Sequence, residues 1–169
     1  MIKHFTATTF ISTSTHTLLH FHKKNKLWLP AGGHVEENET PLEAAKREAF
    51  EETGLDIEIL PTHENFQFTE PKQVTSPASI LLEDIEESKT EPKHQHIDLI
   101  FFAKPVRLPV RLNEMTIPDG WYWVSEEELN NDRLFNENIS KGNGFTLEDV
   151  KILGLNSIRK CKSIGVKFD

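Results

Sequence analysis

The chain has 169 residues, of which 37% are hydrophobic and 27% charged, and its 19 basic and 27 acidic side chains give a formal net charge of −8. This length predicts a single domain over residues 1–169, and the composition, the short apolar runs and a lone cysteine exclude a disordered chain, a membrane protein and a disulfide framework. The acidic balance argues against a nucleic-acid polymer as partner, and an N-terminus without an apolar signal sequence predicts a cytoplasmic location.

The first part of the chain alternates polar residues with Thr, Phe, Ile and Leu, which predicts extended structure. Residues 2–24 are expected to form two strands, separated near Ser12 to Ser14 and paired as a hairpin. A polar break at Lys23 to Lys26 and the segment Leu27 to Pro30 then lead to Ala31-Gly32-Gly33. At these glycines we expect backbone freedom to matter more than side-chain packing.

The clearest helix signal spans about residues 40–53. Thr40 precedes Pro41 and stands three residues before Glu43, a pattern that predicts an N-cap, a proline in the first turn and a capping-box partner. Gly54 supplies the C-terminal stop. One face carries mostly small residues at helical spacing, namely Leu42, Ala45 and Ala49. We therefore expect this helix to lie close to the element it packs against.

The rest of the chain predicts further strands mixed with two helices. The expected strands are Leu55 to Leu60, Asn65 to Thr69, Ala78 to Ile85, Gln95 to Lys104 and 118–124. Ser125 with Glu128 predicts a capping box for a short helix, and Thr146 with Asp149 predicts the cap of a final helix at about 146–161. The expected inner stripe of that helix is Leu147, Val150, Gly154 and Ile158. Strands and helices mixed in this way predict an α/β fold with a mixed sheet covered by helices.

Three carboxylates share one face of the helix at 40–53. Glu48, Glu51 and Glu52 are spaced i, i+3 and i+4. Like charges at this spacing destabilise an isolated helix by about 0.2–0.5 kcal/mol per pair, and a bound divalent cation would reverse that effect. Hard oxygen ligands suit Mg²⁺ or Mn²⁺, which also hold phosphate oxygens. The alternative is an ordinary surface helix in which glutamate is simply a good helix former.

A longer pattern with fixed spacing surrounds these glutamates and consists of Gly33, Glu39, Arg47, Glu48, Glu51, Glu52 and Gly54. From Gly33 to Leu55 the chain resembles the Nudix box, the signature of the Nudix hydrolase superfamily, with Ala49 where the pattern prefers a bulkier aliphatic residue. The segment Trp28 to Glu36 and the run His96-Ile97-Asp98 also look like bacterial members. The resemblance implies an α/β/α sandwich whose box forms a loop–helix–loop. It further implies hydrolysis of a nucleoside diphosphate linked to another moiety, with Mg²⁺ required and Mn²⁺ as a substitute.

The resemblance also implies roles for individual residues. The metal ligands would be the helix glutamates, Glu48, Glu51 and Glu52. The carbonyl of Gly32 would be a further ligand, Arg47 would orient the glutamates, and Glu39 would brace the loop. A pyrophosphate resists attack because its negative oxygens repel water, so the site must neutralise charge and lower the pKa of the water. We expect Glu51 to be the general base, with Glu52 or a loop carboxylate as the alternative.

Substrate contacts are expected from Gly33, Lys24 and Trp28. Lys24 would either contact phosphates or belong to a solvated turn, and Trp28 would either stack on a base or pack in the core. His94, His96 and Asp98 alternate along one strand. Two histidines so spaced either bind a transition metal, line a pocket or form polar sheet surface.

Two other functions share this scaffold. A Nudix-like regulator would bind a nucleotide without cutting it, but such a module usually lacks carboxylates or carries a DNA-binding domain, and this sequence shows neither trait. An isomerase of prenyl diphosphates needs additional groups that the lone Cys161 does not supply. The sequence leaves open which moiety is released and whether the chain forms a homodimer.

Overall fold

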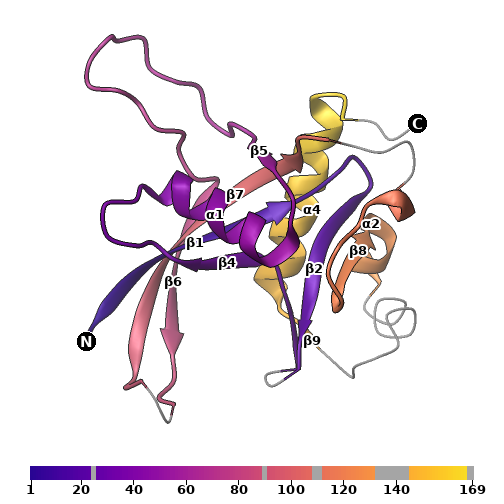
Figure 1. The fold of residues 1–169 in the computed structure, drawn as a ribbon, viewed down its shortest axis with the longest axis horizontal. Helices are drawn as coiled ribbons and strands as arrows, with labels where there is room; N and C mark the ends of the chain where they lie inside the picture. Colours follow the sequence, from indigo (N-terminus) through magenta and orange to yellow (C-terminus); the bar gives the residue numbers. More distant parts are fainter. Residues whose placement is uncertain (24–25, 89–90, 108–111, 132–144, 167–169) are drawn as a thin grey trace.

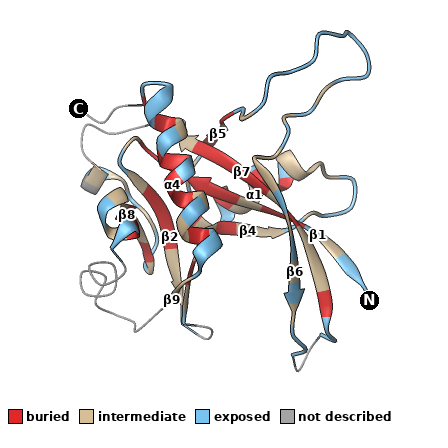
Figure 2. Cartoon of the chain, turned by 180° about the vertical axis from the view of Figure 1, so that it is seen from behind, coloured by how far each residue is buried: buried red, intermediate tan, exposed pale blue. Residues whose placement is uncertain are grey.

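The computed structural model describes residues 1–23, 26–88, 91–107, 112–131 and 145–166. The elements in chain order are β1 (Lys3–Ile11), β2 (His16–His22), β3 (Leu27–Leu29), β4 (Ala31–His34), α1 (Pro41–Thr53), β5 (Ile57–Ile59), β6 (Ser79–Ile85), β7 (His94–Pro105), η1 (Leu112–Glu114), β8 (Trp121–Ser125), α2 (Glu126–Asn130), β9 (Phe145–Thr146) and α4 (Glu148–Ser163). Helix α1 covers one side of the strands and α4 covers the other, as Figures 1 and 2 show from opposite directions. These layers confirm the predicted α/β/α sandwich.

The first sheet is built around a long parallel pair. β1 and β7 pair from Lys3↔Gln95 to Ile11↔Ala103, and the strand order is β4-β1-β7-β5. β6 also pairs with β7, between Ser79↔Ile100 and Ile85↔His94. The second sheet has the order β8-β2-β3-β9. The first sheet is therefore mixed, as predicted, and it carries the long β6–β7 hairpin at one end (Figure 1).

The hairpin predicted for residues 2–24 is wrong, because its two strands belong to different sheets. β1 and β2 share only the bridge Ser12↔Thr17 beside their turn. Both edges of β1 are already paired, one with β4 and the other with β7, so no edge is left for β2. β2 pairs instead with β3 and β8.

Helix α1 begins and ends as predicted. The Thr40 hydroxyl accepts from the Glu43 amide, the Glu43 carboxylate accepts from the Thr40 amide, and Gly54 adopts the left-handed conformation at φ 71°. The buried residues that face the sheet are small: Ala44, Ala45 and Ala49. Thr9 on β1 donates to the Ala45 carbonyl at 3.4 Å, so the close approach expected from small residues is present.

Two further predictions are wrong in their details. Asn65 to Thr69 form an exposed loop rather than a strand, since the edge of β7 on that side is taken by β5 and β6. The final helix is capped by Leu147, without a side-chain hydrogen bond, because Thr146 lies in β9 and pairs with Trp28.

The main core lies between the sheets and α4. It includes Phe10, Leu19, Trp28, Ile100 and Ile158, all at most 2% exposed. Val150, Gly154 and Ile158 face inward as predicted, whereas Leu147 is 40% exposed. Among the described residues, no helix is long and apolar enough to cross a membrane.

Candidate active site

Arg47 of α1 links the loop before the helix to the helix glutamates. Its Nε and Nη2 donate to the two carboxylate oxygens of Glu39 at 2.9 and 2.8 Å. Its Nη1 donates to Glu48 at 2.6 Å and to Glu51 at 3.2 Å. Nη2 also donates to the carbonyl of His34, the last residue of β4, at 3.0 Å. One planar guanidinium therefore ties the β4 end, the loop and two glutamates together, a set of contacts that its fixed fork of donors favours.

The two glycines of β4 bring the backbone against the glutamates. A Cβ atom at Gly33 would overlap the Glu48 carboxylate, and one at Gly32 would stand 2.8–2.9 Å from the Thr8 hydroxyl and the Ala7 carbonyl. The amide of Gly32 donates to Glu52 at 3.1 Å. Glycine is needed at position 32 because backbone atoms of β1 leave no room for a side chain, whereas a side chain at position 33 would displace the Glu48 carboxylate.

The carboxylates of this site differ in their electrostatics. The hydrogen bonds from Arg47 hold the pKa of Glu39 below its ordinary value. Burial raises the pKa of Glu52, with smaller contributions from the nearby charges of Glu48 and Glu51, against the opposing effect of the Gly32 amide. Burial and the neighbouring negative charges therefore both favour the protonated form of Glu52.

The donor set fits a hard divalent cation. Among the described residues, the hydrogen bonds above engage Oε1 of Glu48, Oε2 of Glu51 and Oε2 of Glu52, which leaves the second oxygen of each carboxylate. Carboxylate oxygens are the ligands that Mg²⁺ and Mn²⁺ prefer. Since a cation would also relieve the repulsion at Glu52, these residues fit a metal ion.

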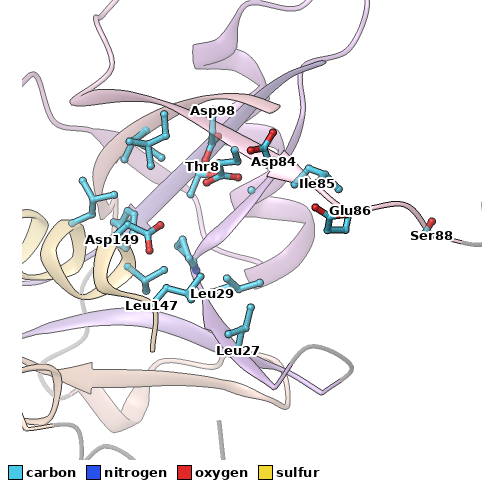
Figure 3. Close-up of a pocket in the computed structure, with 18 of the residues that line it drawn as sticks. Thr8, Leu27, Leu29, Asp84, Ile85, Glu86, Ser88, Asp98, Leu147 and Asp149 are labelled. Carbon is cyan, nitrogen blue, oxygen red and sulfur yellow. The ribbon is translucent and has the colours of Figure 1, made fainter. Parts of the chain in front are cut away.

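A cavity of about 830 Å³ adjoins this site and reaches from Gly32 to the start of α4. Figure 3 shows Leu27, Leu29 and Leu147 along one side and Asp98 and Asp149 facing the cavity from β7 and α4. Its volume and its apolar walls with a few polar groups are typical of a small-molecule site.

The cavity also has carboxylates, and no Lys or Arg is among its described lining residues. Asp98 is 4% exposed and accepts from the Thr6 hydroxyl at 2.9 Å, so its structural hydrogen bond is present. Burial raises the pKa of Asp98. Burial, together with the charges of Asp98 and Asp149, raises the pKa of Glu83 to about 7.

The predicted substrate contacts have different outcomes. Gly33 lies beside Glu48, whereas Lys24 falls outside the described residues. Trp28 is 1% exposed and packs against Phe21 and Tyr122, so its ring belongs to the core, which is the second of the two roles expected for it.

Sequence reasoning missed Glu83 and Asp149 as lining residues of the cavity. The inward position of Glu83 could have been predicted, because Glu83 shares one face of β6 with Leu81 and Ile85. For Asp149 the sequence offered only a capping motif.

A family model for the NUDIX domain matches residues 4–141. Similar solved structures include a NUDIX-family hydrolase from Clostridium perfringens, with 28% identity, coverage of 94% of this chain and 98% of that chain, and a TM-score of 0.63. The Ap4A hydrolase of C. elegans (20% identity, 97% and 98% coverage, TM-score 0.50) and the ORF135 protein of E. coli (15%, 98% and 94%, 0.52) show likeness of fold alone. A search of curated proteins returned no match.

Proposed function

Because this chain belongs to the Nudix family, we propose that it hydrolyses a pyrophosphate bond in a nucleoside diphosphate linked to another moiety. The metal ion we propose is Mg²⁺, with Mn²⁺ as a substitute, held by Glu48, Glu51 and Glu52 with the carbonyl of Gly32. The observation that carries the proposal is the contact of Glu48 with Gly33 and of Glu52 with Gly32, which lines the cavity. Glu51 joins this group because it shares Nη1 of Arg47 with Glu48.

A bound divalent cation would neutralise phosphate charge and lower the pKa of an attacking water. The side chains of the site position the ligands and take up the proton. Arg47 holds Glu48 and Glu51 in place, and Glu39 fixes Arg47 through two hydrogen bonds. The Glu51 side chain is 57% exposed, against 16% for Glu48, and Glu52 is bound to the Gly32 amide. Glu51 is therefore our candidate to take the proton from water.

The cavity would hold the nucleoside part of the substrate. Its carboxylates repel free phosphate groups, so phosphates gain by lying at the metal ligands instead. Leu27, Leu29 and Leu147 offer apolar surface to a base or sugar, while Asp98 and Asp149 can accept hydrogen bonds from ring N–H and amino groups. The charge distribution thus orients the substrate, with its phosphates toward α1.

A substrate panel with Mg²⁺ tests the proposal. The panel contains nucleoside triphosphates, including oxidised ones, together with ADP-ribose, dinucleoside polyphosphates, NADH and nucleotide sugars, with product identification. We expect cleavage of a pyrophosphate bond in at least one compound, and loss of that cleavage when Mg²⁺ is removed by chelation.

Two variants make the result specific to the site. Glu52→Gln keeps the shape of the side chain and removes a charge, so turnover should be lost. Glu37→Gln removes an exposed charge from the loop before α1 and should leave turnover unchanged. Binding of a panel compound without cleavage would instead support the regulator module.

A further inference from the structure

Four histidines gather on one face of the first sheet, at the end that the helices leave uncovered (Figure 2). His4 lies on β1, His34 ends β4, and His94 and His96 lie on β7. The register pairs His4 with His96 and places His34 opposite Thr6, the next inward position of β1. Three strands that are distant in sequence thus bring imidazoles to one place.

The ring nitrogens are close enough to share a ligand. One nitrogen from each of His4, His34 and His96 lies within 4.8 Å of the other two. Nδ1 of His4 is 3.3 Å from Nε2 of His34. Nitrogens bound tetrahedrally to Zn²⁺ at about 2.0–2.1 Å stand about 3.3–3.4 Å apart. The His4–His34 pair already has that spacing, so a modest shift of the His96 ring toward these two nitrogens would complete the set.

His94 orients this group. Its Nδ1 lies 2.8 Å from the Pro92 carbonyl, which can only accept a hydrogen bond, so Nδ1 carries the proton and Nε2 has the lone pair. Nε2 of His96 is 3.1 Å from that atom and therefore donates to it. This chain of bonds leaves Nδ1 of His96 free to coordinate, which is how outer hydrogen bonds position metal-binding histidines.

We propose that His4, His34 and His96 form a transition-metal site, with Zn²⁺ as its simplest occupant and His94 as a positioning residue. Imidazole nitrogens suit Zn²⁺, Cu²⁺ or Ni²⁺, whereas the oxygen ligands of α1 suit Mg²⁺. Water completes a four-coordinate shell around three protein ligands.

His34 links the histidine site to the glutamates of α1 through Arg47. The His34 carbonyl accepts from Nη2 of Arg47 at 3.0 Å, while the His34 ring faces His4. Metal binding at the ring therefore restrains the β4 end that Arg47 contacts. The proposal itself concerns binding and stands whether or not the glutamate site hydrolyses a pyrophosphate.

The experiment is calorimetric titration of the full chain, free of any affinity tag, with Zn²⁺ in an excess of Mg²⁺ that occupies the oxygen ligands. We expect one equivalent of Zn²⁺ to bind. His34→Gln and His4→Gln should each weaken binding at least about 100-fold, and His94→Gln by about 10–100-fold. Circular dichroism checks that each variant is folded, and the exposed His34 is the variant least prone to misfold.

Two control variants and one spectroscopic measurement locate the ion. His63→Gln alters an exposed loop histidine and Glu52→Gln alters the other site, so both should bind Zn²⁺ as the unaltered chain does. With Cu²⁺ as probe, electron paramagnetic resonance should show nitrogen couplings that His34→Gln reduces. The proposal is overturned if the chain binds no Zn²⁺, if His34→Gln binds as tightly as the unaltered chain, or if Glu52→Gln abolishes binding.

Discussion

The carboxylates of α1 and the buried carboxylates of the cavity, Glu83 and Asp98, differ in what compensates their charge. Arg47 contacts Glu39, Glu48 and Glu51 directly. No Lys or Arg is among the described lining residues of the cavity, and the pKa of Glu83 rises to about 7. Of the other lining carboxylates, Glu86 pairs with Lys93 at 2.6 Å. Arg47 favours the ionised form of Glu39, whereas burial favours the protonated forms of Glu83 and Asp98. The same residue types are therefore suited to ion pairing in one place and to hydrogen bonding in the other.

The largest effect is expected when a negative charge is removed from the α1 glutamates. Glu51→Gln should lower kcat by about 10²–10⁴-fold, since it removes a proton acceptor and one negative charge while keeping the shape of the side chain. The measurement is steady-state turnover of the substrate that the panel identifies, with Glu37→Gln as the control. Retention of full turnover by Glu51→Gln would mean that another carboxylate takes the proton.

The fit between β4 and Glu48 offers a second test. A Cβ at Gly33 would overlap the Glu48 carboxylate, so Gly33→Ala should displace Glu48 and lower kcat by about 10²-fold, the cost of misplacing a catalytic group by about 1 Å. Gly154→Ala is the control, because Gly154 lies on α4 and its Cβ would meet apolar side-chain carbons of Leu129 and Thr17 at 3.3 Å instead of a glutamate. Equal turnover in the two variants would contradict the role given to the Gly33 contact.

Arg47→Lys tests the hydrogen bonds of the guanidinium, because it removes them while keeping the positive charge. A lysine cannot reproduce the forked contacts to Glu39, Glu48 and the His34 carbonyl. We expect kcat to fall about 10–100-fold and the free energy of unfolding to fall by about 2 kcal/mol at pH 7, whereas Lys46→Gln, at an exposed neighbouring position, should change neither.

The pH dependence of that stability difference follows from Glu39. Its pKa is lowered in the folded state, chiefly by hydrogen bonds from Arg47, so its stabilising effect is complete above its ordinary pKa of 4.5 and is lost as the pH falls through the lowered value. The difference in melting temperature between the unaltered chain and Arg47→Lys should therefore narrow in acid. A difference that stays constant from pH 7 to pH 3 would assign the effect to something other than Glu39.

The α1 group could be predicted from sequence because it is local. A helix of known phase fixes which side chains share a face, and Thr40, Pro41 and Gly54 mark where that helix begins and ends. Sequence could not predict the cavity carboxylates or the histidine group as units, since each depends on the register of β1 with β7, strands about 90 residues apart. The failed hairpin has the same origin, because strand pairing depends on which edges remain open.

The smallest predicted effect concerns the cavity carboxylates, and it is measured without substrate. Glu83 has a pKa of about 7 in the folded state against an ordinary 4.5. Between these values the folded chain keeps a proton that the unfolded chain has released, so the contribution of Glu83 to stability is lost as the pH rises through this window. Glu83→Gln cannot ionise and should match the unaltered chain below about pH 4.5. At pH 8 it should melt about 2–4 °C higher, a gain on the order of 1 kcal/mol once solvent screening is allowed for.

The control for this effect is Glu64→Gln, which alters an exposed carboxylate in the loop after β5 and should shift neither melting temperature. If Glu83→Gln gains no stability at pH 8, then Glu83 is ionised at no cost and the cavity is not the uncompensated environment that its neighbours Asp98 and Asp149 imply. If it gains stability equally at pH 4 and pH 8, the gain comes from packing rather than charge. Only a gain confined to the higher pH assigns the effect to the cost of ionising Glu83, because burial and the charges of Asp98 and Asp149 act against its ionised form alone.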